Sequence, residues 1–288
     1  MEPLSLSDQE IQRAVAQALA EDIGSGDVTT LAVVPEQSRA RAHMVARESL
    51  TLAGLSLAAE AFRQLSPNVR TNPALADGQS AAPGTVLLHV EGPVRALLSA
   101  ERVALNFVQR LSGIASLTSQ FVRAIHGTRA QILDTRKTTP GWRRLEKYAV
   151  RCGGGQNHRT GLFDLILIKD NHLAALQGEL PNAIAAAVTR SRAAYPSLKV
   201  EVEADTLEQA RQAAAAGADI ILLDNMNPEQ LRGAVQIVQG RAKTEASGGV
   251  NLNTVRAIAE TGVDFISVGA LTHSARAMDI ALDFVPET

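Results

Sequence analysis

Residues 219–249 read DIILLDNMNPEQLRGAVQIVQGRAKTEASGG, and this stretch decides the fold. A short apolar run at 219–225 comes first, and a helical pattern at 227–238 follows it. A second strand-like run at 243–249 closes the stretch. Two strands separated by a helix of this length form a βαβ unit, in which the strands lie parallel. The stretch therefore predicts an α/β fold with a parallel sheet.

The same alternation extends over the chain from about residue 130. Strand-like runs are expected at 130–135, 165–170, 199–204, 219–225, 243–249 and 265–269. Helical runs are expected between the later strands, at 180–195, 206–216, 227–238 and 251–261. Six such units without a glycine-rich dinucleotide fingerprint favour a barrel over a doubly wound sheet. A standard barrel has eight units, so we expect an incomplete α/β barrel.

The first part of the chain has a different pattern. Ser7 and Glu10 form the S-x-x-E capping box that begins a helix. Alternating residues predict strands at 40–46 and 84–92, and a long helical run occupies 99–125. Gly113 is expected to break that helix. The pattern of this part of the chain therefore mixes helices and strands and differs from the regular alternation that begins near residue 130.

Bulk composition excludes several classes of function. The 288 residues include 28 basic and 30 acidic side chains, a net charge of -2, and only 3% aromatic residues. General nucleic-acid binding requires a basic surface, and base stacking requires aromatic side chains. The single cysteine, Cys152, excludes an internal disulfide framework and a cysteine zinc cluster. Without a signal-peptide pattern or a long apolar run, we expect a cytoplasmic protein that binds neither nucleic acid nor membranes.

Positive charge is concentrated between residues 136 and 169. This window holds eight basic residues (Arg136, Lys137, Arg143, Arg144, Lys147, Arg151, Arg159, Lys169) and two acidic ones (Glu146, Asp164). Eight minus two gives +6, so the rest of the chain carries -8. Such an excess indicates either a solvated helix face or an anion-binding site.

The carboxyl ends of the predicted strands carry the candidate site, because active sites of parallel α/β folds lie there. Two strand ends are cationic, two are anionic and two contain glycine. This distribution predicts a pocket that holds a multiply charged anion and also needs carboxylates. The residues at these ends are Thr135, Arg136, Lys137, Lys169, Glu201, Glu203, Asp224, Ser247, Gly248, Gly249, Val268, Gly269 and Ala270.

The two glycine-containing turns favour phosphate binding. Glycines at 248 and 249 precede the helical run at 251–261, so backbone N–H groups and the helix N-terminus can approach an anion. The turn at 268–270 offers a second such site. Two ordinary turns are the alternative, although barrels often bind phosphate after their last two strands.

Glu203 and Asp224 are carboxylates in otherwise apolar strands. Burying a carboxylate is costly unless it is paired. For Asp224, capping the next helix is a competing role. Glu201 points the same way as Glu203, so spacing cannot separate the two.

Several motifs together resemble the quinolinate phosphoribosyltransferase family. They are EDIGSGDVTT, DTRKTTPGWRRLEKYAVRCGGGQNHRTGLFDLILIKDNH, EVEADTLEQA, LLDNM, EASGGV and ISVGALTHS, in the family's order from about residue 20 almost to the end. The resemblance implies an N-terminal α/β sandwich, residues 1–112 joined by 274–288, and an incomplete α/β barrel, residues 113–273. It also implies at least a homodimer, with a hexamer left open.

The resemblance implies phosphoribosyl transfer from 5-phosphoribosyl 1-pyrophosphate to quinolinate, with decarboxylation. The products are nicotinate mononucleotide, pyrophosphate and carbon dioxide, a step of NAD biosynthesis. Quinolinate would be bound by cationic side chains, one of them supplied by the neighbouring subunit. These side chains are Arg102 from the neighbour, Arg136, His158 and Arg159, with Lys137 and Lys169 on pyrophosphate and carboxylate oxygens.

The resemblance also implies the catalytic set, which is Lys137, Lys169, Glu203 and Asp224. Glu203 and Asp224 would stabilise the ribose cation and help to place Mg²⁺. Only the family pattern prefers Glu203 over Glu201. The 5-phosphate would bind at 247–249 and 268–270. A paralogue that ribosylates another heteroaromatic acid and a non-catalytic sensor of phosphoribosyl ligands are the alternatives.

Overall fold

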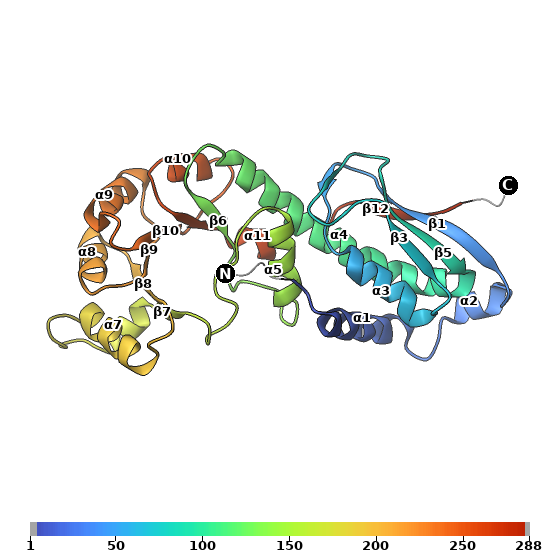
Figure 1. Ribbon diagram of the computed structural model, residues 1–288, viewed down its shortest axis with the longest axis horizontal. Helices are drawn as coiled ribbons and strands as arrows, with labels where there is room; N and C mark the ends of the chain where they lie inside the picture. The colour runs from blue at the N-terminus through green and yellow to red at the C-terminus, as the bar shows by residue number, and fades with distance from the viewer. Residues whose placement is uncertain (1–4, 286–288) are drawn as a thin grey trace. The chain divides into compact units, whose positions relative to one another are not determined.

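The computed structural model describes residues 5–285, which form two compact units, each with its own main sheet (Figure 1). The first unit contains the described residues up to Ser119, the segment Arg144–Gly154 and those from Ser274 onward. The second unit contains Gln120–Arg143 and Gly155–His273. The segment Arg144–Gly154 thus groups with the first unit although it follows that unit's last long helix in the sequence. The domain boundaries expected at 112/113 and 273/274 stay predictions.

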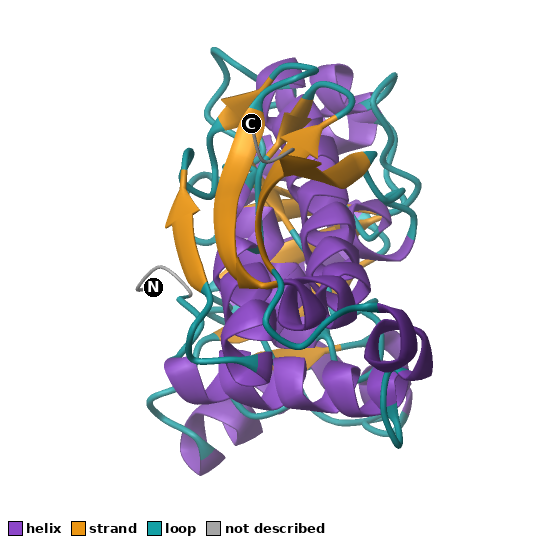
Figure 2. Cartoon of the chain, turned by 90° about the vertical axis from the view of Figure 1, so that its right-hand side faces the viewer, coloured by secondary structure: helices purple, strands orange, loops and turns teal. Residues whose placement is uncertain are grey.

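An antiparallel sheet of four strands organises the first unit. Its order is β12 (Ile280–Val285), β1 (Arg39–Ala46), β5 (Val86–Pro93) and β3 (Arg70–Pro73). In β1, Ala42, Met44 and Ala46 are fully buried, as period-two alternation requires of the core-facing side of a strand. A further two-stranded sheet pairs β2 (Leu50–Thr51) with β4 (Ser80–Ala81). The long, curved strands are seen in Figure 2.

The helices of the first unit begin with α1 (Asp8–Ile23), whose capping box is confirmed. Glu10 N–H donates to Ser7 Oγ over 3.3 Å, and Ser7 N–H donates to Glu10 Oε2 over 2.9 Å. The helices α2 (Val28–Val33), α3 (Leu55–Leu65), α4 (Val94–Ala124) and α5 (Arg143–Cys152) follow. None of the helices described between residues 5 and 285 has the length and apolar character that a membrane crossing requires.

The break expected at Gly113 is wrong, because α4 is a single helix of 31 residues that continues through this glycine. A Cβ atom on Gly113 would lie 1.8 Å from the carbonyl oxygen of Arg276. Gly153 is similar, since its Cβ would lie 2.4 Å from the carbonyl oxygen of Ala115 in the same helix. Both glycines allow another backbone to approach α4 closely, a role that local propensity does not reveal.

Six parallel strands form the second unit, in the order β6 (Gln131–Leu133), β11 (Phe265–Ser267), β10 (Lys243–Ser247), β9 (Ile220–Asp224), β8 (Val200–Ala204) and β7 (Ile166–Ile168). The first strand, β6, pairs with the last, β11, and β6 and β7 are the two edges of the sheet. The α/β class and the incomplete barrel are thereby confirmed. The sheet is open between its first two strands.

Helices follow the strands of the second unit: α6 (Asp170–Ala174), α7 (Ala183–Ala194), α8 (Leu207–Ala215), α9 (Pro228–Val238), α10 (Val255–Ala259) and α11 (Ala270–His273). The helices α7, α8 and α9 lie along the outside of the curved sheet (Figure 1). The helix expected at 251–261 is shorter than predicted, because α10 begins only at Val255. A turn occupies the residues before it.

Candidate active site

Alternation along the barrel strands brings polar side chains to one interior surface. In β8, Val200, Val202 and Ala204 are fully buried, while Glu201 and Glu203 point the other way. The parallel register places Glu203 beside Leu222 of β9, and Leu222 in turn beside Glu245 of β10. Polar residues of β8 and β10 therefore lie at the same level inside the barrel, with Leu222 of β9 between them.

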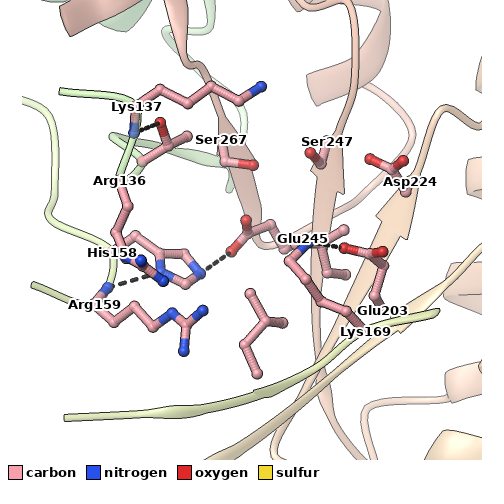
Figure 3. A pocket seen from close by; sticks show the side chains of 13 residues that line it. Arg136, Lys137, His158, Arg159, Lys169, Glu203, Asp224, Glu245, Ser247 and Ser267 are labelled. Carbon is pink, nitrogen blue, oxygen red and sulfur yellow. Dashed lines mark hydrogen bonds and ion pairs between the residues drawn. The ribbon is translucent and has the colours of Figure 1, made fainter. Parts of the chain in front are cut away.

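A cavity of about 420 Å³ lies at this surface (Figure 3). Nine of the predicted residues line it: Thr135, Arg136, Lys137, His158, Arg159, Lys169, Glu203, Asp224 and Ser247. Leu167, Leu222, Glu245 and Ser267 also line it and were not predicted. The size is that of a typical small-molecule site.

The remaining predicted residues do not line the cavity. Gly248 and Gly249 directly follow the cavity-lining Ser247, and 268–270 directly follows Ser267. Arg102 is an exposed residue of α4 in the first unit.

Two guanidinium groups give the cavity an unbalanced positive charge. The Nε atom of Arg136 is buried and has no hydrogen-bond partner within the described residues. Burial and the nearby charge of Arg136 lower the pKa of Arg159 from its usual value. One Arg159 donor is used by the Leu165 carbonyl, over 3.2 Å. Two repelling cations with an unused buried donor are suited to an anionic ligand.

Cation and carboxylate meet on the other side of the cavity. Lys169 Nζ forms an ion pair with Glu203, whose side chain is 11% exposed (Figure 3). Asp224 Oδ2 accepts a hydrogen bond from Asn225 Nδ2 over 2.6 Å. The helix-cap alternative for Asp224 is wrong, because Asn227 caps α9. Glu203 and Asp224 both line the cavity, and their carboxylate oxygens are of the kind that Mg²⁺ prefers as ligands.

The glycine turn after β10 has a backbone that other residues cannot easily adopt. Gly248 has φ +97° and Gly249 has φ +60°. A Cβ on Gly248 would also lie 2.2 Å from Asn225 Oδ1. The prediction that a helix N-terminus directly follows this turn is wrong, because α10 starts only at Val255. Any phosphate here would be bound by the turn itself.

The turn after β11 is held against the end of β6. Thr272 Oγ1 donates to the carbonyl oxygen of Lys137 over 2.7 Å. A Cβ on Gly269 would lie 3.1 Å from Cδ of Lys137. The Lys137 side chain thus passes close to the backbone of this second glycine turn.

A buried acidic pair, Glu201 and Glu245, lies at the wall of the cavity, and of the two only Glu245 lines it. Glu201 is fully buried, and its Oε2 lies 2.9 Å from Nε2 of His158. Glu245 Oε2 lies 3.6 Å from the same nitrogen. Glu203 therefore lines the cavity and Glu201 does not, a distinction that spacing could not give. Glu245 was missed because only strand ends were considered, although its alternation with Lys243 and Ser247 matches that of Glu201 and Glu203.

The basic excess between 136 and 169 is only partly an anion site. Arg136, Lys137, Arg159 and Lys169 line the cavity. The other four cations, Arg143, Arg144, Lys147 and Arg151, belong to α5, where Arg144 Nε pairs with Glu10 Oε1 over 2.7 Å. None of these four is exposed and Lys147 is fully buried, so the solvated helix face that was the alternative is wrong.

Comparison with known proteins covers almost the entire chain. The family model "Quinolinate phosphoribosyl transferase, N-terminal domain" matches residues 27–112, and the corresponding C-terminal domain model matches residues 114–283. A probable nicotinate-nucleotide pyrophosphorylase [carboxylating] of Bacillus subtilis is 45% identical over 95% of this chain and 93% of its own length. The Mycobacterium leprae nicotinate-nucleotide pyrophosphorylase [carboxylating] is 46% identical over 96% of this chain and 99% of its own.

Solved structures give the same result. The nicotinate-nucleotide pyrophosphorylase from Francisella tularensis has a TM-score of 0.92 and 41% identity, over 99% of both chains. NadC from Streptococcus pyogenes has a TM-score of 0.92 and 41% identity, over 98% of this chain and 99% of that chain. Sequence and backbone therefore agree on one group of relatives.

Proposed function

Because this chain belongs to the quinolinate phosphoribosyltransferase family, we propose that it transfers a phosphoribosyl group from 5-phosphoribosyl 1-pyrophosphate to quinolinate and releases carbon dioxide. The products are nicotinate mononucleotide and pyrophosphate, so the reaction belongs to NAD biosynthesis. The observation that carries the assignment is the pair Arg136 and Arg159, whose repulsion and unused buried donor call for an anion. Quinolinate brings two adjacent carboxylates, which match two planar guanidinium groups.

We propose distinct roles for the cations of the cavity. Arg136 and Arg159 bind the carboxylates of quinolinate. Lys137, beside the second glycine turn, binds phosphate oxygens, and the turns at 247–249 and 268–270 bind the 5-phosphate. Lys169 exchanges its ion pair with Glu203 for contacts to substrate oxygens. Thr135 Oγ1 supports this edge by accepting the N–H of Lys137 over 3.1 Å.

Glu203 and Asp224 act on the sugar. As pyrophosphate leaves, positive charge develops on the ribose, and carboxylates fixed nearby stabilise that charge. The pyridine nitrogen then bonds to the ribose carbon. The positively charged ring stabilises the carbanion left when carbon dioxide departs, and that carbon then takes a proton from water to give the product. The side chains therefore orient the substrates and neutralise their charge.

Mg²⁺ is part of the proposal, and the residues present fit it. Carboxylate oxygens are the ligands that Mg²⁺ prefers, and Glu203 and Asp224 both line the cavity. Bound with pyrophosphate, the ion would neutralise negative charge on the leaving group.

We also propose a homodimer in which Arg102 of one subunit reaches the other's cavity. Its exposure on α4 leaves the guanidinium available for such a contact. Mixing Arg102→Ala protein with Lys169→Ala protein tests it. Hybrid dimers with one intact cavity regain activity, and a mixture as inactive as its parents would contradict the shared site. A cytoplasmic location stays a prediction, which cell fractionation tests.

The decisive experiment is incubation with quinolinate, 5-phosphoribosyl 1-pyrophosphate and Mg²⁺. Formation of nicotinate mononucleotide is followed together with release of labelled carbon dioxide from the 2-carboxyl group. Both products are expected in equal amounts. Turnover of another heteroaromatic acid, with none from quinolinate, would reassign the substrate; ligand binding without pyrophosphate release would rule out the enzyme.

A further inference from the structure

Both ring nitrogens of His158 are engaged inside the protein. Nδ1 accepts the backbone N–H of Arg159 over 2.7 Å. Nε2 faces Glu201 Oε2 at 2.9 Å and Glu245 Oε2 at 3.6 Å. A nitrogen that accepts a hydrogen bond carries no proton, so the proton of the neutral ring lies on Nε2. The protonated nitrogen therefore faces the buried acidic pair.

This tautomer excludes a metal site at the same three residues. His158, Glu201 and Glu245 place their ligand atoms within 4.8 Å of one another, as metal ligands would. A metal-bound histidine, however, normally donates its other ring N–H to an acceptor. In His158 the other nitrogen is itself the acceptor, so binding through Nε2 would leave the ring without any proton.

The acidic pair holds less than two negative charges. Burial, and then repulsion from Glu201, raise the pKa of Glu245 to about 8. Glu245 is therefore mostly protonated at neutral pH, which lowers the charge that the pair holds in the protein interior. None of the four carboxylate oxygens has a hydrogen bond of ordinary geometry among the described residues, so the pair meets His158 Nε2 as a close charged contact.

A third buried carboxylate holds the same segment from the opposite side. Asp134, at the end of β6, is fully buried. It accepts the backbone N–H of His158 over 2.8 Å and the side-chain amide of Asn157 over 2.6 Å. Residues 157–159 are thus fixed by acids from three regions of the barrel. The guanidinium of Arg159 enters the cavity from this segment (Figure 3).

We propose that Glu201 and Glu245 are positioning residues for quinolinate binding: they orient the His158 ring, which sets the backbone of Arg159 and hence its guanidinium. His158 then does not clamp a carboxylate through a ring N–H, the role that the family resemblance implied. The quinolinate part of this inference depends on the proposed function, whereas the hydrogen-bond chain does not.

Substitution of Glu201 tests the proposal with two substrates. Glu201→Met removes the acceptor at similar volume, and replacing a buried charge by an apolar group usually preserves folding. We expect the KM for quinolinate to rise about tenfold, the effect of one hydrogen bond, with the KM for 5-phosphoribosyl 1-pyrophosphate unchanged. Glu201→Gln keeps an acceptor oxygen and should restore most of the affinity. His158→Gln, which keeps an N–H near Nε2, should outperform His158→Leu.

Asp264→Asn is the matched control, since Asp264 is a largely buried carboxylate at the amino end of β11. It should lower the melting temperature without changing either KM. Equal rises of both KM values in Glu201→Met, or quinolinate binding as in the wild type, would overturn the positioning role.

The tautomer is tested without substrate. Long-range ¹H–¹⁵N spectra of histidine-labelled protein, assigned with His158→Gln, should show a neutral ring protonated at Nε2. A proton on Nδ1, or a spectrum shifted by added Zn²⁺ at this ring, would overturn the network. If wild-type protein makes no nicotinate mononucleotide, the proposed function fails while this measurement still decides the hydrogen-bond chain.

Discussion

The two ends of the barrel treat buried charge in opposite ways. At the amino end, Asp264 accepts Lys243 Nζ over 2.9 Å and Thr244 N–H over 3.0 Å, and it also pairs with Arg129. Nearby, Asp219 Oδ2 accepts from Arg192 over 2.8 Å. At the carboxyl end, the Arg136 Nε donor is unused within the described residues. The buried charges described at the amino end have their partners within the protein, whereas a buried donor at the carboxyl end has none among the described residues.

The pKa directions follow this difference. Burial alone would raise the pKa of Asp264, but hydrogen bonds from Lys243, Thr244 and Arg129 outweigh it and lower the pKa. For Glu245, burial and Glu201 act together and raise the pKa to about 8. At the amino end, the pairing of Asp264 with these donors stabilises the fold. At the carboxyl end the buried Arg136 donor is left available for a ligand, in line with the general position of sites in parallel α/β folds.

The strongest test of this contrast is removal of a guanidinium at the carboxyl end. We expect Arg136→Ala and Arg159→Ala each to raise the KM for quinolinate ~100-fold, because a charge-assisted pair with the ligand is lost. The melting temperature should change little, since neither arginine has an ion-pair partner among the described residues. Arg192→Ala at the amino end is the control, with lower stability and unchanged KM. Unaltered quinolinate affinity in both cavity variants would contradict the proposed roles.

Loss of a carboxylate at the amino end should act on stability alone. Asp264→Asn leaves the donors of Lys243 and Thr244 without their charged acceptor. We expect the free energy of unfolding to fall by about 2 kcal/mol, measured by urea denaturation. A rise in either KM would show that the two ends are coupled.

The glycine turn provides a more modest test at the carboxyl end. Gly248→Ala places a Cβ against Asn225 and forces alanine to φ +97°. We expect about a tenfold higher KM for 5-phosphoribosyl 1-pyrophosphate, since a strain of 1–2 kcal/mol would displace the turn. Gly240→Ala, also at positive φ but with nothing within 4 Å of its Cβ, separates backbone strain from phosphate binding. Equal KM changes in both variants would argue against a phosphate site.

The smallest expected effect is a pH dependence of stability. The folded-state pKa of Glu245, about 8, exceeds the ordinary value of 4.5, so the wild type loses stability as pH rises between these values. Glu245→Gln mimics the protonated acid and escapes that loss. Relative to wild type, its melting temperature should therefore increase between pH 5 and pH 9, by roughly 2–4 °C for each kcal/mol of stability that the wild type loses. A constant difference would mean that Glu245 is ionised throughout.

Sequence patterns predicted the strands well, because each strand's apolar face must be buried whatever its neighbours are. DIILLDN, for example, became β9 (Ile220–Asp224). They also brought seven of the cavity residues together, since parallel strands place their carboxyl ends at one edge. His158 and Arg159 were expected there only from the family resemblance. Long-range packing was not predictable: Gly113 looks like a helix break until Arg276 is seen against it. Glu245 was missed for another reason, since only strand ends were considered, but its contact with Glu201 and His158 could not be predicted because these residues come from distant segments.

The sheet is open between β6 and β7, and the segment 156–159 pairs with the free edge of β6 and also lines the cavity. Gln156 N–H donates to the Ile132 carbonyl over 2.8 Å, and Asp134 N–H donates to the Gln156 carbonyl over 3.2 Å. Two residues further along, His158 and Arg159 line the cavity. A ligand that immobilises those side chains also holds the segment against β6. Slower deuterium uptake at the Gln156 amide would therefore report occupancy of the cavity from within the barrel wall.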